Sequence, residues 1–579
     1  MMEENRNFIL AIVLTMVILF GWEYFYGAPM REEAEQAASE QAVTAEQAGV
    51  PEMSAGAVEA GGIPGMAAPV VKEIATNRNK VIGERQNILI SGGRVKGTIN
   101  LKGLRFDDLT LIDYREEVDP NSPEITLLNP SDSFNAYFAD FGWIGDGKRP
   151  DANSVWTANK TALSSDDTIT FTWDNGEGLI FTRDVSLDQD YMFTIKQSVQ
   201  NNSSSTVAMA TYGRVYREGR SSEQPLFILH EGPIRVGEDG KEEIGYEDLE
   251  DDTYEKEEVS GGGWVGITDK DWMVAVIPDQ SQDFVSNVSR TEQNGGEQFH
   301  VNFATNGISI PAGATAERTS QFFAGAKEVD LLEKYTEDGG IKMFDYAIDW
   351  GWFYFITKPI YFGLHFFYGI VGNFGIAIIL LTMVVKGLLF PMANKQYESM
   401  ARMKKLQPKM AKLKEKYGDD RARMQQETMK MYQEEKVNPL ASCLPIFIQI
   451  PIFFSLYKVL YVTIDMRHAP FFGWIKDLSA PDPLLVTNLF GLIPWDPPSF
   501  IAIGILPVFM GLTMYFQQKL NPPMTDPIQQ KVFAFMPIIF TFILAGFSVG
   551  LVIYWTWNNI LTICQQWFIM RRVAALDNK

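Results

Sequence analysis

The stretch that decides the fold is FGIAIILLTMVVKGLLF, residues 374–390. It is apolar throughout, apart from Thr382 and Lys386. An α-helix rises about 1.5 Å per residue, so roughly 20 residues cross a bilayer, and this run with its flanks approaches that length. We therefore predict a transmembrane helix over residues 373–393 with two polar side chains inside it.

Other apolar runs of similar length surround this one. We expect further transmembrane helices over residues 439–463, 499–519, 532–548 and 549–570. A shorter apolar run, Phe8–Phe20, lies near the N-terminus, and no small-x-small cleavage site follows it promptly. We expect it to form a signal-anchor helix over residues 1–27, which gives six spans; a cleaved secretory peptide is the alternative. In either case the segment that follows is exported.

Charge divides the chain into two unlike halves. Residues 1–349 contain 28 basic and 59 acidic residues, whereas residues 350–579 contain 22 basic and 13 acidic residues. The segment 394–438 carries 12 of these basic residues. Basic loops stay on the cytoplasmic side of a membrane. We therefore expect a protein of the bacterial inner membrane. Both termini should lie in the cytoplasm and the acidic half in the periplasm.

The acidic half is itself divided in two. Residues 28–75 are rich in Ala, Gly, Glu and Gln and lack aromatic residues, which predicts a disordered tether. Residues 76–335 contain short alternating runs such as Thr168–Trp173, followed by the turn-forming pair Asn175-Gly176. Many such strands without helical periodicity predict an antiparallel β-sandwich.

The remaining segments connect these units. Residues 341–372 are aromatic but interrupted by charges and a proline, which is typical of an amphipathic helix lying in the membrane interface. Within the loop 464–498, the apolar insertion Leu484–Ile493 is too short to span a bilayer, and we expect it to be re-entrant or interfacial. The other connections are a cytoplasmic helical hairpin (394–438), a cytoplasmic loop (520–531) and a cytoplasmic tail (571–579). The predicted fold is a polytopic α-helical membrane protein of six transmembrane helices with a periplasmic β-sandwich.

Motifs of soluble enzymes are weak in this chain. Gly142–Lys148 fits most of a P-loop, but Arg149 and Pro150 follow where Ser or Thr and a helix are required. The four histidines are scattered singly, without the spacing of metal ligands. We expect no catalytic residue, no cofactor, no metal site and no sequence-specific nucleic-acid binding.

Lys386 is the informative polar residue. It lies about 18 Å along the predicted helix, where a charge costs about 3 kcal/mol. Its ammonium could simply reach the headgroups. However, Thr382 lies one turn earlier on the same face, and the later spans carry the amides Gln449, Gln517 and Asn558. Such residues either hydrogen-bond between helices or line a hydrated groove in the inner half of the membrane, and we predict the groove.

Methionines recur at helical spacing in the cytoplasmic segment. They are Met400, Met403 and Met410, with Lys404 and Lys405 between them. A coiled-coil seam explains most of this pattern. The alternative is an adaptable apolar surface that contacts varied client segments, because methionine side chains are flexible.

Several of these stretches resemble the YidC family of membrane protein insertases. They are Val385–Pro391, Val437–Leu440, Leu444–Phe453, Asp526–Lys531, Gly550–Trp555 and, in the exported half, Gly262–Trp272. The resemblance runs essentially from end to end. It implies that the exported domain is a large β-sandwich similar to sugar-mutarotase folds, without that activity.

The resemblance also implies a groove open to cytoplasm and lipid, with a basic residue at Lys386, where the family often has Arg. Thr382, Gln449 and Trp555 match groove or client-contacting positions, and Trp555 stands where the family often has Tyr. Nascent membrane proteins, the Sec translocon with its accessory subunits, the ribosome and membrane lipids are the implied partners. Met400, Met403, Met410, Lys404 and Lys405 are the residues expected to contact clients or the ribosome.

Two other functions stay open. A secondary transporter would also bury a lysine, but its halves should show internal repeats, and we find none. A membrane-tethered sugar-active enzyme would need paired carboxylates or histidines in the β domain.

Overall fold

The computed structural model describes residues 78–221, 229–251, 254–293, 296–417, 420–435, 444–495, 497–498, 501–521 and 527–577. The described residues all belong to one compact unit, Ile63–Lys579. The signal-anchor expected over 1–27 and the tether expected over 28–75 lie outside the described residues.

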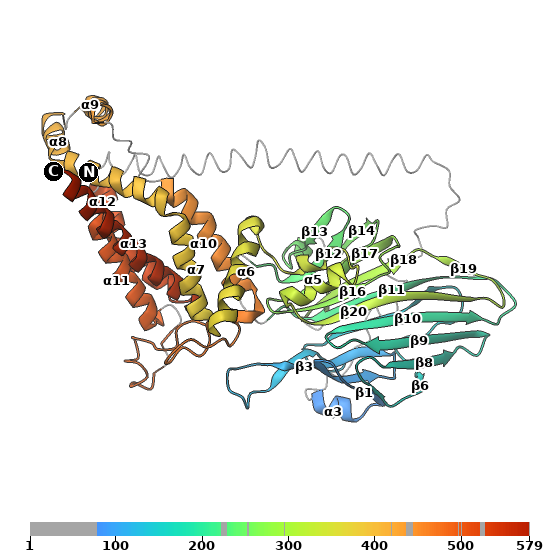
Figure 1. Ribbon diagram of the computed structural model, residues 1–579. Helices are drawn as coiled ribbons and strands as arrows, with labels where there is room; N and C mark the ends of the chain where they lie inside the picture. Colours follow the sequence, from blue (N-terminus) through green and yellow to red (C-terminus); the bar gives the residue numbers. More distant parts are fainter. Residues whose placement is uncertain are drawn as a thin grey trace, which may run out of the picture. The chain divides into compact units, whose positions relative to one another are not determined.

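Two β-sheets form the first part of the described chain (Figure 1). The 11-stranded sheet contains β1 (Asn87–Gly92), β2 (Val95–Asn100), β3 (Arg105–Arg115), β4 (Glu124–Leu128), β5 (Tyr137–Gly145), β7 (Ala162–Leu163), β11 (Val207–Glu218), β14 (Tyr254–Val259), β17 (Phe284–Gln293), β18 (Gly296–Thr305) and β19 (Ile308–Ile310). The nine-stranded sheet contains β6 (Thr157–Ala158), β8 (Thr168–Asp174), β9 (Leu179–Leu187), β10 (Met192–Asn201), β12 (Gly232–Gly237), β13 (Gly240–Glu243), β15 (Trp264–Thr268), β16 (Trp272–Ile277) and β20 (Thr315–Ala326). Neighbouring strands pair antiparallel along both sheets, except for the parallel pair β1 and β7.

The hairpin expected at Asn175-Gly176 joins β8 to β9. Asp174 pairs with Ile180 across the two strands. The Asn175 side-chain oxygen accepts hydrogen bonds from the backbone N–H groups of Glu177 and Leu179, at 2.7 and 2.9 Å. Gly176 has a φ of 72°, a conformation that glycine adopts without a steric penalty.

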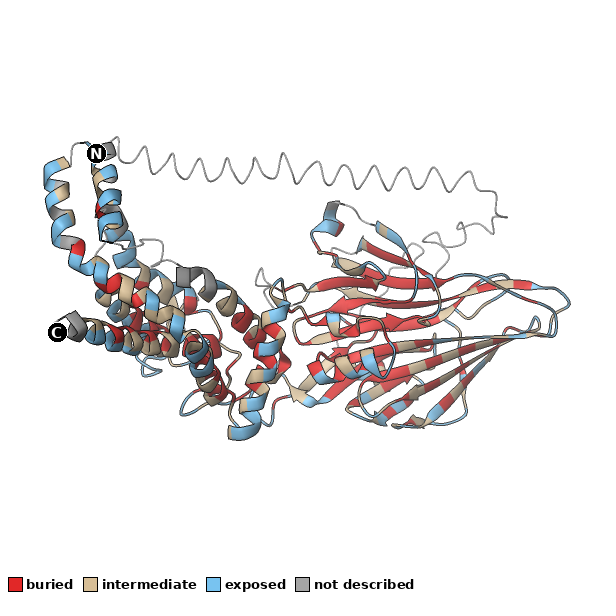
Figure 2. Ribbon diagram, turned by 45° about the horizontal axis from the view of Figure 1, so that its top comes forward, coloured by how far each residue is buried: buried red, intermediate tan, exposed pale blue. Residues whose placement is uncertain are grey.

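Aromatic side chains join the two sheets face to face. The ring of Phe106 on β3 lies 5.4 Å from that of Phe193 on β10 and 5.1 Å from that of Phe322 on β20. All three side chains are almost completely buried. Figure 2 shows buried residues running along the strands, as the alternation in the sequence requires. The β-rich domain is therefore a sandwich.

Helices make up the rest of the described chain. They are α3 (Arg78–Gly83), α4 (Asp248–Asp251), α5 (Val329–Glu337), η3 (Phe344–Ala347), α6 (Tyr354–Val371), α7 (Phe374–Leu388), α8 (Phe390–Tyr417), α9 (Arg421–Glu434), α10 (Leu444–Val462), η5 (Ile464–Met466), α11 (Ile505–Leu520), α12 (Pro527–Leu544) and α13 (Val549–Asp577). The interfacial helix expected over 341–372 begins only at Tyr354. Gly351, with a φ of 70°, lies in the non-helical segment before it.

The helix expected over 373–393 is bent. α7 ends at Leu388, α8 begins at Phe390, and their axes differ by 67°. Pro391 explains the break, because it has no N–H to donate to the carbonyl of Gly387 and its ring crowds that carbonyl. Lys386 therefore lies near the end of α7 instead of inside one straight span.

By length and composition, no single helix among the described residues is long and apolar enough to cross a membrane. The bent pair Phe374–Leu388 and Phe390–Leu406 meets the criterion together, and Gln449–Val462 and Gln530–Leu544 are shorter apolar helices.

The apolar insertion Leu484–Ile493 forms turns and not a helix. Asp482 fixes its base, since its carboxylate accepts hydrogen bonds from the backbone N–H of Leu484 at 3.0 Å and of Leu506 at 2.8 Å. Leu489 and Phe490 have positive φ values, 51° and 62°. Such angles are strained for bulky side chains, so the surrounding turn must hold them.

Candidate functional site

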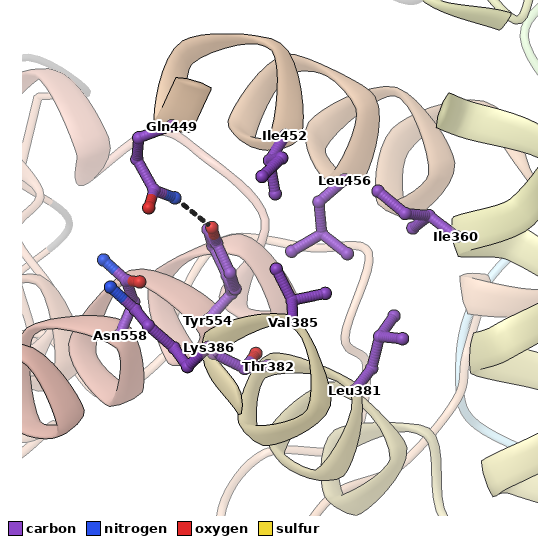
Figure 3. Close-up of a pocket in the computed structure, with 10 residues that line it drawn as sticks. All are labelled: Ile360, Leu381, Thr382, Val385, Lys386, Gln449, Ile452, Leu456, Tyr554 and Asn558. Carbon is purple, nitrogen blue, oxygen red and sulfur yellow. Dashed lines mark hydrogen bonds between the residues drawn. The ribbon is translucent and has the colours of Figure 1, made fainter. Parts of the chain in front are cut away.

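A small cavity lies among α6, α7, α10 and α13. It is lined by Ile360, Leu381, Thr382, Val385, Lys386, Gln449, Ile452, Leu456, Tyr554 and Asn558. Its volume is about 10 Å³, which is enough for about one water molecule. Figure 3 shows its apolar side chains on one side, with Lys386, Asn558, Gln449 and Tyr554 clustered on the other. Four of the residues singled out in the sequence thus meet at one place: Thr382, Lys386, Gln449 and Asn558.

Lys386 is half-buried and points toward α13. Its ammonium donates a hydrogen bond to the Thr562 hydroxyl oxygen, at 3.0 Å. The Thr562 hydroxyl in turn donates to the backbone oxygen of Asn558, at 2.7 Å. Among the residues that the structure describes, no carboxylate forms an ion pair with Lys386. Its positive charge is therefore held by a neutral hydroxyl.

Amide and hydroxyl groups continue along the same face of α13. Gln449 donates a hydrogen bond from its side-chain amide to the Tyr554 hydroxyl, at 2.9 Å. The side-chain oxygen of Asn558 is buried and has no hydrogen-bond partner within the described part of the chain. Tyr554, Asn558 and Thr562 are four residues apart, so they lie on one helix face. This face offers both donors and acceptors to a polar guest.

Thr382 lines the cavity but is already satisfied. Its hydroxyl donates to the backbone oxygen of Ile378 one turn earlier, at 2.6 Å. The residue is 4% exposed. It can still accept a hydrogen bond, because a hydroxyl oxygen has two lone pairs.

Two of the residues expected in the groove lie elsewhere. The ring of Trp555 packs between those of Phe453 and Phe540, at 4.6 and 5.6 Å. Gln517 is half-buried on α11 and does not line the cavity. The face of Trp555 differs from that of Tyr554 by one residue, about 100° around the helix, which explains why one lines the cavity and the other does not.

Other amides of α13 connect helices. Asn559 donates to the hydroxyl oxygen of Thr513 on α11, and Gln566 donates to the side-chain oxygen of Asn521, both at 3.2 Å. All but Asn521 are buried. Interhelical hydrogen bonding, the alternative weighed from the sequence, therefore accounts for these amides.

Sequence reasoning missed Thr562 and Tyr554. Threonine and tyrosine are common in apolar helices, so their composition gave no signal. Their spacing from Asn558 was the available signal, because each lies four residues, about one helical turn, from it.

The cytoplasmic methionines fall into two clusters. Met403 and Met410 pack beside Leu406 and Met431, which joins α8 to α9. Met400 packs instead with Tyr397 and with Ile569 of α13. Lys404 and Lys405 are exposed on α8. The seam between α8 and α9 thus uses Met403 and Met410, whereas Met400 packs against α13, and the contact of these methionines with clients or the ribosome stays a prediction.

Comparison with protein families covers almost all of the described chain. Residues 87–362 match the model of the YidC periplasmic domain, and residues 366–576 match that of the 60Kd inner membrane protein. A membrane protein insertase YidC from Rhizobium meliloti is 46% identical over 100% of this chain and 98% of its own length. This chain belongs to the YidC family.

Other YidC relatives align as completely. The membrane protein insertase YidC of Rickettsia rickettsii is 45% identical, covering 97% of this chain and 98% of the relative. Among solved structures, an active YidC insertase crystal structure with the first transmembrane domain resolved has a TM-score of 0.35 and 18% identity, over 83% of this chain and 92% of that chain. A galactose mutarotase related enzyme from Lactobacillus acidophilus has a TM-score of 0.29 and 12% identity, over 41% and 97%.

Membership gives the two described parts their identities. The β-sandwich corresponds to the YidC periplasmic domain, and the helical region corresponds to the inner-membrane part of the family.

Proposed function

We propose that this chain is a membrane protein insertase whose clients enter the bilayer beside Lys386. One observation carries the proposal: a lysine ammonium among apolar helices has a hydroxyl, and no described carboxylate, as its partner. A charge held in this way costs free energy unless it binds something. Binding of an acidic or polar client segment would offset that free-energy cost.

The proposed step is transfer without covalent chemistry. The polar flank of a client replaces its lost hydration with Lys386, Asn558 and Gln449. Its apolar stretch then moves against the helices into lipid. Each unpaired backbone group costs several kcal/mol in hydrocarbon, so polar groups along the route lower the barrier. Partition of the apolar stretch into lipid drives the step, and no nucleotide is required.

For clients to pass, the cavity must widen. Its volume of about 10 Å³ admits one water and no peptide. Supporting such opening, only single hydrogen bonds within the described residues join Lys386 to Thr562 and Gln449 to Tyr554 beside the cavity, and the chain bends at the junction between α7 and α8. The closed cavity is then the resting form, and the hydrated groove expected from the sequence is the form with a client bound.

The membrane arrangement is part of the same proposal. The spans are residues 1–27, 373–393, 439–463, 499–519, 532–548 and 549–570, with 341–372 in the interface. Both termini and the segment 394–438 lie in the cytoplasm, where Lys404, Lys405 and the methionines contact clients or the ribosome. Trp555 and Gln517 contact clients after the cavity opens. The Sec translocon, its accessory subunits and membrane lipids are further partners, and the chain has no enzymatic activity.

The test compares charge variants of Lys386 in proteoliposomes. Lys386→Glu should strongly reduce insertion of single-span clients with acidic flanks, while Lys386→Arg should retain it. Lys519→Glu is the matched control, because Lys519 is exposed at the end of α11. Insertion is measured as the protease-protected fraction of the client. Equal insertion by the Glu and Arg variants would falsify the proposal.

A further inference from the structure

A second cavity lies in the interior of the β-sandwich, and charged side chains line it. Its volume is about 20 Å³, which is room for one or two water-sized atoms. Arg105 and Asp140 come from the first sheet and Arg183 from the second, with Trp156 and Tyr212 as aromatic walls. Buried cavities in proteins are usually apolar unless something polar occupies them.

Arg183 is the central group of this cavity, and it is 2% exposed. Its guanidinium donates to the backbone oxygens of Phe141 and Leu104, at 2.5 and 3.3 Å, and to the side-chain oxygen of Gln197, at 3.2 Å. All three acceptors are neutral. Within the described ranges Arg183 forms no ion pair, and its buried Nε has no hydrogen-bond partner. Burial lowers the pKa of Arg183 to about 10, so the guanidinium remains charged at neutral pH.

The nearby carboxylate is already engaged. Asp140 accepts two hydrogen bonds from Arg214, at 3.1 and 2.5 Å. Arg105 lies 3.8 Å from the same carboxylate and donates to the Ser131 hydroxyl at 2.9 Å. Arg214 and Arg105 therefore share the carboxylate of Asp140, and Arg183 forms no ion pair with it. Because an uncompensated buried charge is costly, the electrostatic field in the cavity favours an anion.

Asp151 lies at the rim and is exposed. One of its carboxylate oxygens accepts hydrogen bonds from the backbone N–H of Asn153 and from the Ser154 hydroxyl, at 2.8 and 3.0 Å. It stabilises its own turn and forms no ion pair with Arg105 or Arg183. Its negative charge should weaken anion binding without preventing it.

We propose that this cavity binds one oxyanion, the carboxylate or phosphate group of a ligand, between Arg183 and Arg105. The unpartnered Nε–H of Arg183 can donate a hydrogen bond to one oxygen of such a group, and the Arg105 guanidinium can donate to the other. Trp156 fixes the plane of Arg183, since the guanidinium carbon lies 5.2 Å from the ring centre. The available space holds only the one or two oxygen atoms that face the arginines, so the rest of the ligand would extend past Asp151. This site is separate from the insertase cavity and does not depend on its function.

The test uses inorganic phosphate as probe and the full-length chain in detergent micelles. Broadening of the phosphate ³¹P NMR line is titrated at constant ionic strength, with sodium chloride as the balancing salt. We expect saturable binding that Arg105→Gln weakens about tenfold. Lys102→Gln should leave it unchanged, because Lys102 is exposed and does not line the cavity. Displacement of phosphate by acetate would extend the site to carboxylates, and its absence would restrict it to phosphates.

Equal broadening in the Arg105→Gln and Lys102→Gln variants would mean an adventitious ion only, and it would overturn the proposal. If the Arg105 variant does not fold, Asp151→Asn tests the same site from the exposed rim. Loss of that charge should tighten phosphate binding about threefold. An unchanged affinity in Asp151→Asn would also overturn the proposal.

Discussion

The ammonium of Lys386 on α7 lies 3.0 Å from the hydroxyl oxygen of Thr562 on α13. These residues are 176 positions apart in the chain. Their hydrogen bond fixes where the positive charge sits in the cavity, because a long lysine side chain could otherwise turn toward the end of α7. Thr562 is thus a positioning residue for Lys386.

Removal of the Thr562 hydroxyl should therefore impair insertion. We expect Thr562→Val to lower the insertion rate of acid-flanked clients about tenfold, the value of one hydrogen bond to a charged group, and Thr562→Ser to restore it. The measurement is the initial rate at which clients become protease-protected in proteoliposomes. Thr556→Val is the control, since the Thr556 hydroxyl is buried on the same helix and donates to the backbone oxygen of Val552. Valine and serine variants with equal rates would contradict the role.

The hydrogen bond between Gln449 and Tyr554 should contribute measurably to the closed cavity. A double-mutant cycle with Gln449→Leu and Tyr554→Phe should give a coupling free energy of about 0.6 kcal/mol for unfolding in the membrane. The cavity holds about one water, so solvent cannot fully replace the lost partner. Steric trapping in bicelles measures the unfolding free energies. A coupling near zero would show that the site is already open and wet at rest.

Acid should destabilise the β domain through His300. Burial and the nearby Arg214 lower the pKa of this histidine from 6.5 to about 3. The unfolded chain thus binds a proton below pH 6.5 that the folded chain does not, and stability falls as the pH drops from 6.5 toward 3. The loss should approach about 3 kcal/mol at pH 4. Pulse proteolysis at pH 7 and pH 4 measures it, and His300→Gln should reduce the pH dependence. An unchanged dependence would assign the acid sensitivity to other groups.

Substitutions of a buried and of an exposed methionine can distinguish the two roles expected for the methionines, a seam between helices and a surface that contacts clients. Met431 is 8% exposed in the seam between α8 and α9, whereas Met429 is 49% exposed. Met431→Gln should destabilise the pairing of these helices by about 2 kcal/mol, because it buries an amide in an apolar contact. Limited proteolysis of the 394–438 segment reports this, and Met429→Gln should behave as wild type. If only Met429→Gln alters client crosslinking, the exposed methionine contacts clients and the seam does not.

Much of the architecture follows from local patterns. Alternation in Thr168–Trp173 and the Asn175-Gly176 turn predict a hairpin because both signals are contained within a few residues. The apolar run at 374–390 predicts a helix for the same reason. The bend between Leu388 and Phe390 was also encoded locally, in Pro391, but a hydropathy pattern does not weigh the lost N–H donor.

The sequence by itself determined which segments are strands and apolar helices, that the two halves differ in charge, and that Lys386 is a polar exception requiring a partner. Only the tertiary structure decided which residue is the hydrogen-bond partner of Lys386. Thr562 and Tyr554 were selected over Trp555 and Gln517 by the rotation of α13 and the place of α11, and helix rotation depends on packing against distant segments. The tertiary structure also placed Arg183 beside a cavity, where it forms no ion pair with a described carboxylate. This placement arises where the two sheets meet. The type of a residue specifies its chemistry. Its neighbours in space are decided by packing between parts of the chain that are far apart in sequence.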